Sequence, residues 1–157
     1  MVRERIRGLG ERGFTLAELL VVIATIGILS ILVTPTLISY WNASTLQAGA
    51  EELTAAINRG RQLAIVQNTT VCVQPSGASI TMRTGGCAGT LYTGPGTSAS
   101  GVISLASGMQ ASFASGTSVV FTNLGAASPA ATLRVTSPTT GRTRDVVVSA
   151  SGQVRVQ

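Results

Sequence analysis

Residues 13–41 read GFTLAELLVVIATIGILSILVTPTLISYW. From Leu19 to Ala50 there is no charged side chain, and this length exceeds the roughly 20 residues that a helix needs to cross a bilayer. Glu18 is the one acid near the start of this apolar run. A carboxylate in lipid is costly, so a lone acid there indicates a function that involves a partner charge. The stretch therefore predicts a membrane-spanning helix with Glu18 as a functional residue.

The motif Gly-Phe-Thr-Leu-Ala-Glu resembles the N-terminal signal of type IV pilins and of the pseudopilins of type II secretion. The resemblance implies that a prepilin peptidase cuts between Gly13 and Phe14 and methylates the new amine of Phe14. Glu18 would then be the fifth mature residue, where the family has its glutamate, and Pro35 the twenty-second, where many members have a helix-kinking proline. An ordinary signal anchor is the alternative, but it has no use for a buried acid.

The family resemblance also gives Glu18 a mechanism. In pilin-like proteins, the glutamate of one subunit pairs with the N-terminal amine of its neighbour. A buried charge without a partner is costly, whereas a matched one is not. We therefore expect Glu18 to select the axial register as the subunit moves from the membrane into a filament.

The charge pattern predicts the orientation of the helix. The 157 residues carry 11 basic and 6 acidic side chains, a net charge of +5, and every basic residue is an arginine. Four of the arginines precede the apolar run, which keeps that end in the cytoplasm and sends the rest to the periplasm. A cleaved secretory signal peptide is the alternative, but the apolar run is too long for one.

Residues 42–67 change to an amphipathic helical pattern. Apolar residues recur at three- and four-residue steps, namely Leu46, Ala50, Leu53, Ile57 and Ala64. We predict one continuous helix over residues 14–67, whose second half packs under a globular domain. Gly49 and Gly60 weaken it by about 1 kcal/mol each relative to alanine. The pair Tyr40-Trp41 fits either the far membrane interface or packing on the domain.

The remainder, residues 68–157, has the short apolar runs and turn residues of a β domain. We predict strands over 70–74, 78–83, 102–105, 109–114, 118–122, 131–136, 144–149 and 153–157, with a turn at 75–77 and a long loop over 84–100. The fold class is α+β and pilin-like, with the long helix packed on a small, mostly antiparallel sheet domain. The predicted segments are a leader over 1–13, a membrane or filament-core helix over 14–41, an amphipathic helix over 42–67 and the β domain.

Residues 60–64, Gly-Arg-Gln-Leu-Ala, resemble a segment of the H-type pseudopilin and FimT subfamily, in which a strand with a cysteine follows the helix. Gly60 departs from the usual alanine. Cys72 and Cys87 are the only cysteines. An oxidising compartment favours a disulfide between them, and two free thiols are the alternative. Two cysteines without histidine provide too few ligands for a metal site, and no cofactor is expected.

The chain lacks histidine, the usual general base, and its acids outside the apolar run do not form a pair. Glu51 and Glu52 are adjacent and point to different faces of a helix, and Asp145 lies beside Arg142 and Arg144, which suggests a solvated ion pair with them. We therefore expect no catalytic residues and no enzymatic activity.

The last arginines suggest a second function. FimT-like minor pilins that take up DNA carry a Gly-Arg-x-Arg motif near the C-terminus. Gly141 to Arg144 has this pattern, whereas Gly152 to Arg155 has glutamine in place of the first arginine. Arg142, Arg144 and Arg155 are thus candidate DNA-binding residues, with salt-sensitive contacts to phosphate. The alternative is that they are ordinary solvated strand ends.

Together these observations predict a minor pseudopilin or pilin at the tip of a type II secretion pseudopilus or a type IV pilus. It would support protein secretion or pilus assembly, and DNA uptake in natural transformation is the alternative function. The expected partners are other pilins or pseudopilins, prepilin peptidase, the inner membrane and, for the alternative, DNA. The expected location is the bacterial inner membrane, crossed once, and a periplasmic filament after assembly.

Overall fold

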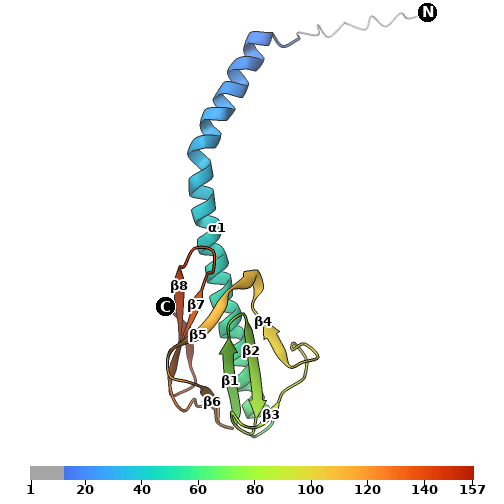
Figure 1. Ribbon diagram of the computed structural model, residues 1–157, viewed down its shortest axis with the longest axis vertical. Coiled ribbons are helices and arrows are strands. Elements are labelled where there is room, and N and C mark those ends of the chain that lie inside the picture. Colours follow the sequence, from blue (N-terminus) through green and yellow to red (C-terminus); the bar gives the residue numbers. More distant parts are fainter. Residues whose placement is uncertain (1–12) are drawn as a thin grey trace, which may run out of the picture. The chain divides into compact units, whose positions relative to one another are not determined.

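The computed structural model describes residues 13–157, apart from the side chains of Leu32 and Ser107. The chain divides into two compact units that meet between Tyr40 and Trp41. The first unit is the beginning of helix α1 (Leu16–Val66), and the second contains the rest of α1 and the strands (Figure 1). The predicted leader over 1–13 lies, except for Gly13, outside the described residues.

Helix α1 is the single long helix that the pattern of residues 14–67 predicts. Thr15 precedes it, and its hydroxyl oxygen accepts a hydrogen bond of 3.2 Å from the backbone N–H of Glu18. Such an N-cap satisfies one of the free donors of the first turn. The helix is continuous through Pro35, and the kink there stays a prediction. Asn68, with φ of 49°, turns the chain away just after α1.

The described apolar side chains of α1 between Leu16 and Tyr40 are exposed to the surroundings. The serine and threonine hydroxyls between them all donate to backbone carbonyls of the same helix: Thr25 to Val22, Ser30 to Ile26, Thr34 to Ser30, Thr36 to Val33 and Ser39 to Thr36. By length and composition, α1 can cross a membrane, and it is the one such helix among residues 13–157.

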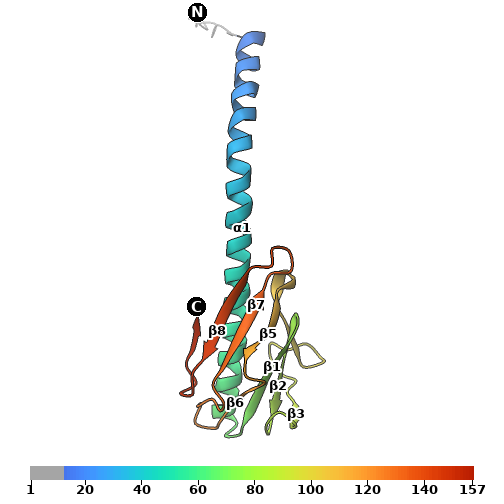
Figure 2. The same ribbon diagram turned by 60° about the vertical axis from the view of Figure 1, so that its left-hand side comes forward.

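The second unit contains two antiparallel sheets (Figure 2). The first sheet has the order β3-β2-β1-β6, with β4 also paired to β2. Its strands are β1 (Val71–Ser76), β2 (Ser79–Thr84), β3 (Thr90–Leu91), β4 (Val102–Ser104) and β6 (Val119–Phe121). The second has the order β5-β7-β8-β9, with β5 (Gln110–Ser115), β7 (Ala131–Thr136), β8 (Thr143–Val148) and β9 (Val154–Val156). A short 3-10 helix, Ala106–Gly108, precedes β5.

The inner faces of both sheets and the later part of α1 form one hydrophobic core. The predicted apolar positions Ala50, Leu53, Ile57 and Ala64 are all fully buried, and Leu46 nearly so. The mostly antiparallel α+β architecture is therefore confirmed, and it consists of two sheets around one helix.

The two glycines in the buried part of α1 mark its closest approaches to the sheets. A Cβ added to Gly60 would lie 2.5 Å from Cγ2 of Val73, and one added to Gly49 would lie 2.7 Å from Cγ of Met109. Non-bonded carbon atoms normally lie about 3.5–4.0 Å apart, so a side chain at either position would force its neighbour to move. Because glycine has no side chain, the backbone of α1 can pack directly against both sheets at these two positions, and the lower helix propensity of glycine is the cost.

Two predictions about the strands were wrong. Pro75 and Ser76 belong to β1, where Pro75 pairs with Ile80, so the turn is residues 77–78 and not the predicted 75–77. Pairing of β1 with β6 ends at Val73, so Pro75 has a partner strand on one side only, which is where proline is tolerated. The predicted loop over 84–100 contains the short strand β3, paired with the end of β2.

We expect Gly60→Ala to lower the free energy of unfolding by about 1–2 kcal/mol. The gain in helix propensity is about 1 kcal/mol, whereas overpacking a core costs about 1–3 kcal/mol, and a stiff neighbour places the cost here at about 2–3 kcal/mol. Val73 is β-branched and has few rotamers, so it cannot move aside easily. Thermal unfolding of the full chain in detergent, followed by circular dichroism, measures the effect. Gly49→Ala is the matched control, because unbranched Met109 adapts more easily and the cost is smaller. An unchanged or higher Tm for Gly60→Ala would contradict the close packing.

Candidate functional site

The predicted processing and assembly residues lie together at the start of α1. Gly13 and Phe14 lie outside any helix or strand, and both are exposed. Glu18 is in the first turn, and its side chain is exposed. A carboxylate in this place is stabilised by the positive end of the helix dipole. The peptide bond between Gly13 and Phe14 is thus exposed and outside regular secondary structure, and the exposed carboxylate of Glu18 lies on the same short segment.

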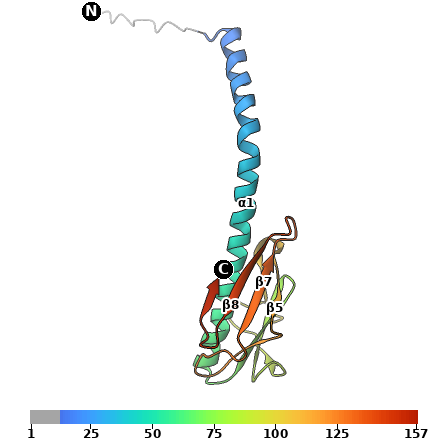
Figure 3. The same cartoon turned by 90° about the vertical axis from the view of Figure 1, so that its left-hand side faces the viewer.

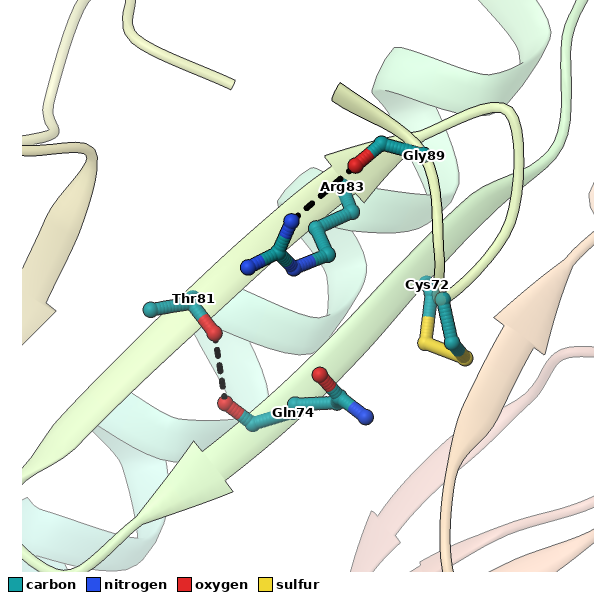
Figure 4. The surroundings of a disulfide bond; sticks show 6 residues. Cys72, Gln74, Thr81, Arg83 and Gly89 are labelled. Atoms are coloured by element: carbon teal, nitrogen blue, oxygen red, sulfur yellow. Dashed lines mark hydrogen bonds between the residues drawn. A yellow bond between two sulfur atoms is a disulfide. The ribbon is translucent and has the colours of Figure 1, made fainter. Parts of the chain in front are cut away.

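Cys72 and Cys87 form a disulfide, with their Cα atoms 4.9 Å apart (Figure 4). Cys72 is fully buried in β1, and Cys87 belongs to the turn that follows β2. Arg83 donates a hydrogen bond of 3.0 Å to the carbonyl oxygen of Gly89 in the same turn. The disulfide and this bond both hold the first part of the glycine-rich loop against the sheet.

The structure does not bring the three candidate DNA-binding arginines together. Arg142 lies in the connection between β7 and β8, and Arg144 is near the start of β8. Side chains alternate along a strand, so Arg144 shares the face of the buried Val146. Arg155 pairs with Val147 and thus lies on the opposite face of the sheet. Arg144 and Arg155 therefore lie on opposite faces of the sheet, and DNA binding by the three arginines stays a prediction.

The partner of Asp145 is Arg134 of the neighbouring strand, and the predicted ion pair with Arg142 and Arg144 is wrong. Asp145 accepts hydrogen bonds of 2.7 and 2.8 Å from Nε and Nη2 of Arg134. These bonds lower the pKa of Asp145 and raise the pKa of Arg134. The alternation of β8 separates the faces of Asp145 and Arg144, and only the register with β7 identifies the correct partner.

Arg61 has a structural role that sequence analysis missed. Its Nε donates a hydrogen bond of 2.9 Å to the carbonyl oxygen of Gly125, in the turn after β6. A Cβ added to Gly152, in the turn after β8, would lie 3.1 Å from the same Nε. Arg61 therefore bonds the end of α1 to the turn after β6 and lies beside the turn after β8. The resemblance of residues 60–64 to a segment of the family was the one sequence feature that could have pointed to a role for Arg61.

The residues that could perform chemistry are scattered. Within residues 13–157, no group of three or more histidine, cysteine, aspartate or glutamate side chains could hold a metal ion. Glu52 accepts a hydrogen bond of 2.7 Å from the backbone N–H of Ala106, and Glu51 accepts one of 2.8 Å from the side chain of Gln47. Both acids thus have local structural partners.

Several solved structures share the fold of this chain. The minor pilin FimU of Pseudomonas aeruginosa aligns with a TM-score of 0.55 at 20% identity and covers 71% of this chain and 92% of that chain. The minor pseudopilin EpsH from the type 2 secretion system of Vibrio cholerae aligns with a TM-score of 0.54 at 13% identity, covering 71% and 95%. GspH of Escherichia coli aligns with a TM-score of 0.58 at 14% identity, covering 73% and 88%.

At such identities, these structures establish the pilin-like fold alone. A search of curated proteins finds no matching relative. The family model described as type II transport protein GspH matches residues 49–152, which is more than half of the chain and includes the later part of α1 and most of the β region. The chain therefore belongs to the type II transport protein GspH family.

Proposed function

We propose that this chain is a minor pseudopilin or minor pilin, which joins other pilin-like chains at the tip of a periplasmic filament. It would support protein secretion by a type II system or assembly of a type IV pilus. The observation that carries the proposal is α1, which forms the core of a GspH-type domain and continues into an exposed apolar segment. That segment needs lipid or other helices to cover it.

The proposal includes a maturation step and a location. Prepilin peptidase cuts between Gly13 and Phe14 and methylates the amine of Phe14, and the exposed, non-helical peptide bond supports this step. Before assembly, the apolar segment crosses the inner membrane once, with the second unit in the periplasm. Glu18 then pairs with the amine of a neighbouring subunit. The role is structural, which agrees with the lack of histidine and the scattered acids.

DNA uptake is the second candidate function, and the structure gives it no specific support. Arg142 and Arg144 lie on one hairpin, Arg155 lies on the other face of the sheet, and Arg134 is neutralised by Asp145. A protein that binds DNA through its phosphates needs several cations on one surface.

Deletion of the chain from its host, followed by secretion and piliation assays, tests the proposed function. We expect either type II secretion or surface piliation to fall at least about tenfold, and which of them falls identifies the machine. A photo-crosslinker in place of Ile26, on the exposed part of α1, should capture pilin-like chains, whereas one in place of Ser151 serves as a control. Intact secretion and piliation, with no pilin-like chain among the crosslinked products, would overturn the proposal.

A further inference from the structure

The hairpin loop between β7 and β8, residues 137–142, lies at the end of the second unit where α1 enters it. A Cβ added to Gly49, early in this part of α1, would lie 3.5 Å from Cγ1 of Val135 in β7. One added to Gly125 would lie 2.9 Å from Ile65, near the end of α1. Strand β7 therefore runs toward the beginning of the unit, and the loop follows directly after it (Figure 3).

This loop is cationic and has a defined conformation. The backbone N–H of Ser137 donates to the carbonyl of Arg142 at 2.9 Å, and the N–H of Gly141 donates to the carbonyl of Ser137 at 2.9 Å. These bonds close the loop, and they leave the side chains of Arg142 and Arg144 exposed. From Ser137 to Arg144 the segment contains no acid.

The charges of the two arginines are not neutralised within the described residues. The salt bridge found over 13–157 is Arg134 with Asp145. The other acids of the second unit, Glu51 and Glu52, bond to Gln47 and to the N–H of Ala106. Arg142 and Arg144 are therefore available to an external anion.

Two aromatic residues mark the same end of the unit. Trp41, the first residue of the second unit, is 68% exposed, and Tyr40 before it is 72% exposed. For Trp41, packing on the domain, one of the sequence alternatives, is therefore wrong. Exposed tryptophan and tyrosine at the end of an apolar segment are typical of the level of lipid headgroups. The covalent connection thus tethers this end of the unit to the membrane surface.

We propose that Arg142 in the hairpin loop and Arg144 at the start of β8 bind the phosphate groups of anionic phospholipids at the periplasmic surface of the inner membrane. The inference rests on the proposed membrane anchoring of α1. The guanidinium group of arginine matches phosphate oxygens in a bidentate geometry. DNA offers the same phosphate chemistry, but a cationic hairpin tethered beside the membrane meets lipid phosphates first. Bound in this way, the second unit is held against the bilayer until the subunit is assembled.

Fluorescence of the full chain in liposomes tests this binding. Both native cysteines are in the disulfide, so Thr139→Cys provides a single thiol in the loop for an environment-sensitive dye. We expect brighter, blue-shifted emission in vesicles that contain phosphatidylglycerol than in pure phosphatidylcholine. Each of Arg142→Gln and Arg144→Gln should lower the docking equilibrium constant about fivefold. Added salt should weaken docking as well.

Matched variants separate the loop from general charge effects. Arg155→Gln removes the same charge from the opposite face of the sheet and should leave docking unchanged. A dye at Ser151→Cys, in the turn after β8, should not respond to lipid charge. DNA and inorganic phosphate are added separately to the neutral vesicles, and neither should change the emission at position 139.

Three results would overturn the inference. These are equal emission on neutral and anionic vesicles, a response that persists in the Arg142→Gln/Arg144→Gln variant, and a response to DNA or phosphate without one to anionic lipid. Extraction of the vesicles with alkaline carbonate keeps the two proposals distinct. A chain removed by carbonate would refute the membrane anchoring itself, whereas an anchored chain with an indifferent loop would refute only the binding of lipid.

Discussion

Glu18→Gln is expected to leave the chain inserted and processed but to reduce its incorporation into filaments at least about tenfold. The substitution keeps the shape of the side chain and removes its charge. In the proposed assembly, the amine of Phe14 in a neighbouring subunit then enters the apolar filament core without a counter-charge. Leaving one partner of a buried ion pair alone costs about 3–5 kcal/mol. Incorporation is measured as the fraction of the chain in sheared filaments relative to the membrane fraction.

The N-terminal structure shows why insertion and processing should survive this change. Gly13 and Phe14 precede α1, and the N–H of Glu18 bonds to the hydroxyl of Thr15 through its backbone, which glutamine preserves. Glu51→Gln is the matched control, because Glu51 is exposed and bonds to Gln47 on its own helix. Normal incorporation of Glu18→Gln would remove the charge pair from the mechanism. Loss of processing would instead place Glu18 in the recognition of the peptidase.

Reduction of the disulfide between Cys72 and Cys87 is expected to lower the stability of the second unit by about 3 kcal/mol. The two cysteines are 15 residues apart, and a crosslink that closes a loop of this size restricts the unfolded chain by about that amount. The corresponding fall in Tm is roughly 10–20 °C. Thermal unfolding of the full chain in detergent, with and without reductant, measures it.

The native loop should keep its conformation after reduction at low temperature. The bond from Arg83 to Gly89 and the pairing of β3 with β2 still hold it. Amide hydrogen exchange over residues 85–91 tests this part of the expectation. The Cys72→Ala/Cys87→Ala variant is the control, since its additional loss of stability relative to the reduced chain reports the packing of the buried Cys72 sulfur. A Tm that changes by only one or two degrees on reduction would contradict the expected contribution.

The sequence predicts α1 well because local signals agree along it. An uninterrupted apolar run predicts the exposed first part, and three- and four-residue steps predict the buried positions from Leu46 to Ala64. Hydrophobic periodicity depends on which face of the helix meets the core, and it requires no knowledge of the partner. Local patterns also predicted that residues 68–157 form a β domain, because short apolar runs alternate there with turn residues.

The details that the sequence missed depend on contacts between distant segments. Gly60 was interpreted as a weak point of the helix, because its contact with Val73 appears only after β1 has paired with β2 and packed on α1. The partner of Asp145 and the separation of Arg144 from Arg155 both depend on strand register, and a shift of one residue would reverse the faces. Proline is a turn signal in most contexts, so only the end of pairing with β6 explains Pro75 within β1.

The serine and threonine hydroxyls in the apolar part of α1 affect the proposed transfer of the subunit from lipid into a filament. Each one donates to a carbonyl of its own helix, as Ser30 does to Ile26 and Thr34 to Ser30. An unpaired hydroxyl in an apolar medium would cost several kcal/mol, but each of these donors has its acceptor on the same helix, so the bond persists when the helix moves. The helix therefore has the same hydrogen bonds in a bilayer as in a bundle of helices. These hydroxyl groups therefore add no hydrogen-bond penalty to the proposed transfer of the segment from lipid into a filament, and Glu18 is the side chain whose partner changes in that step.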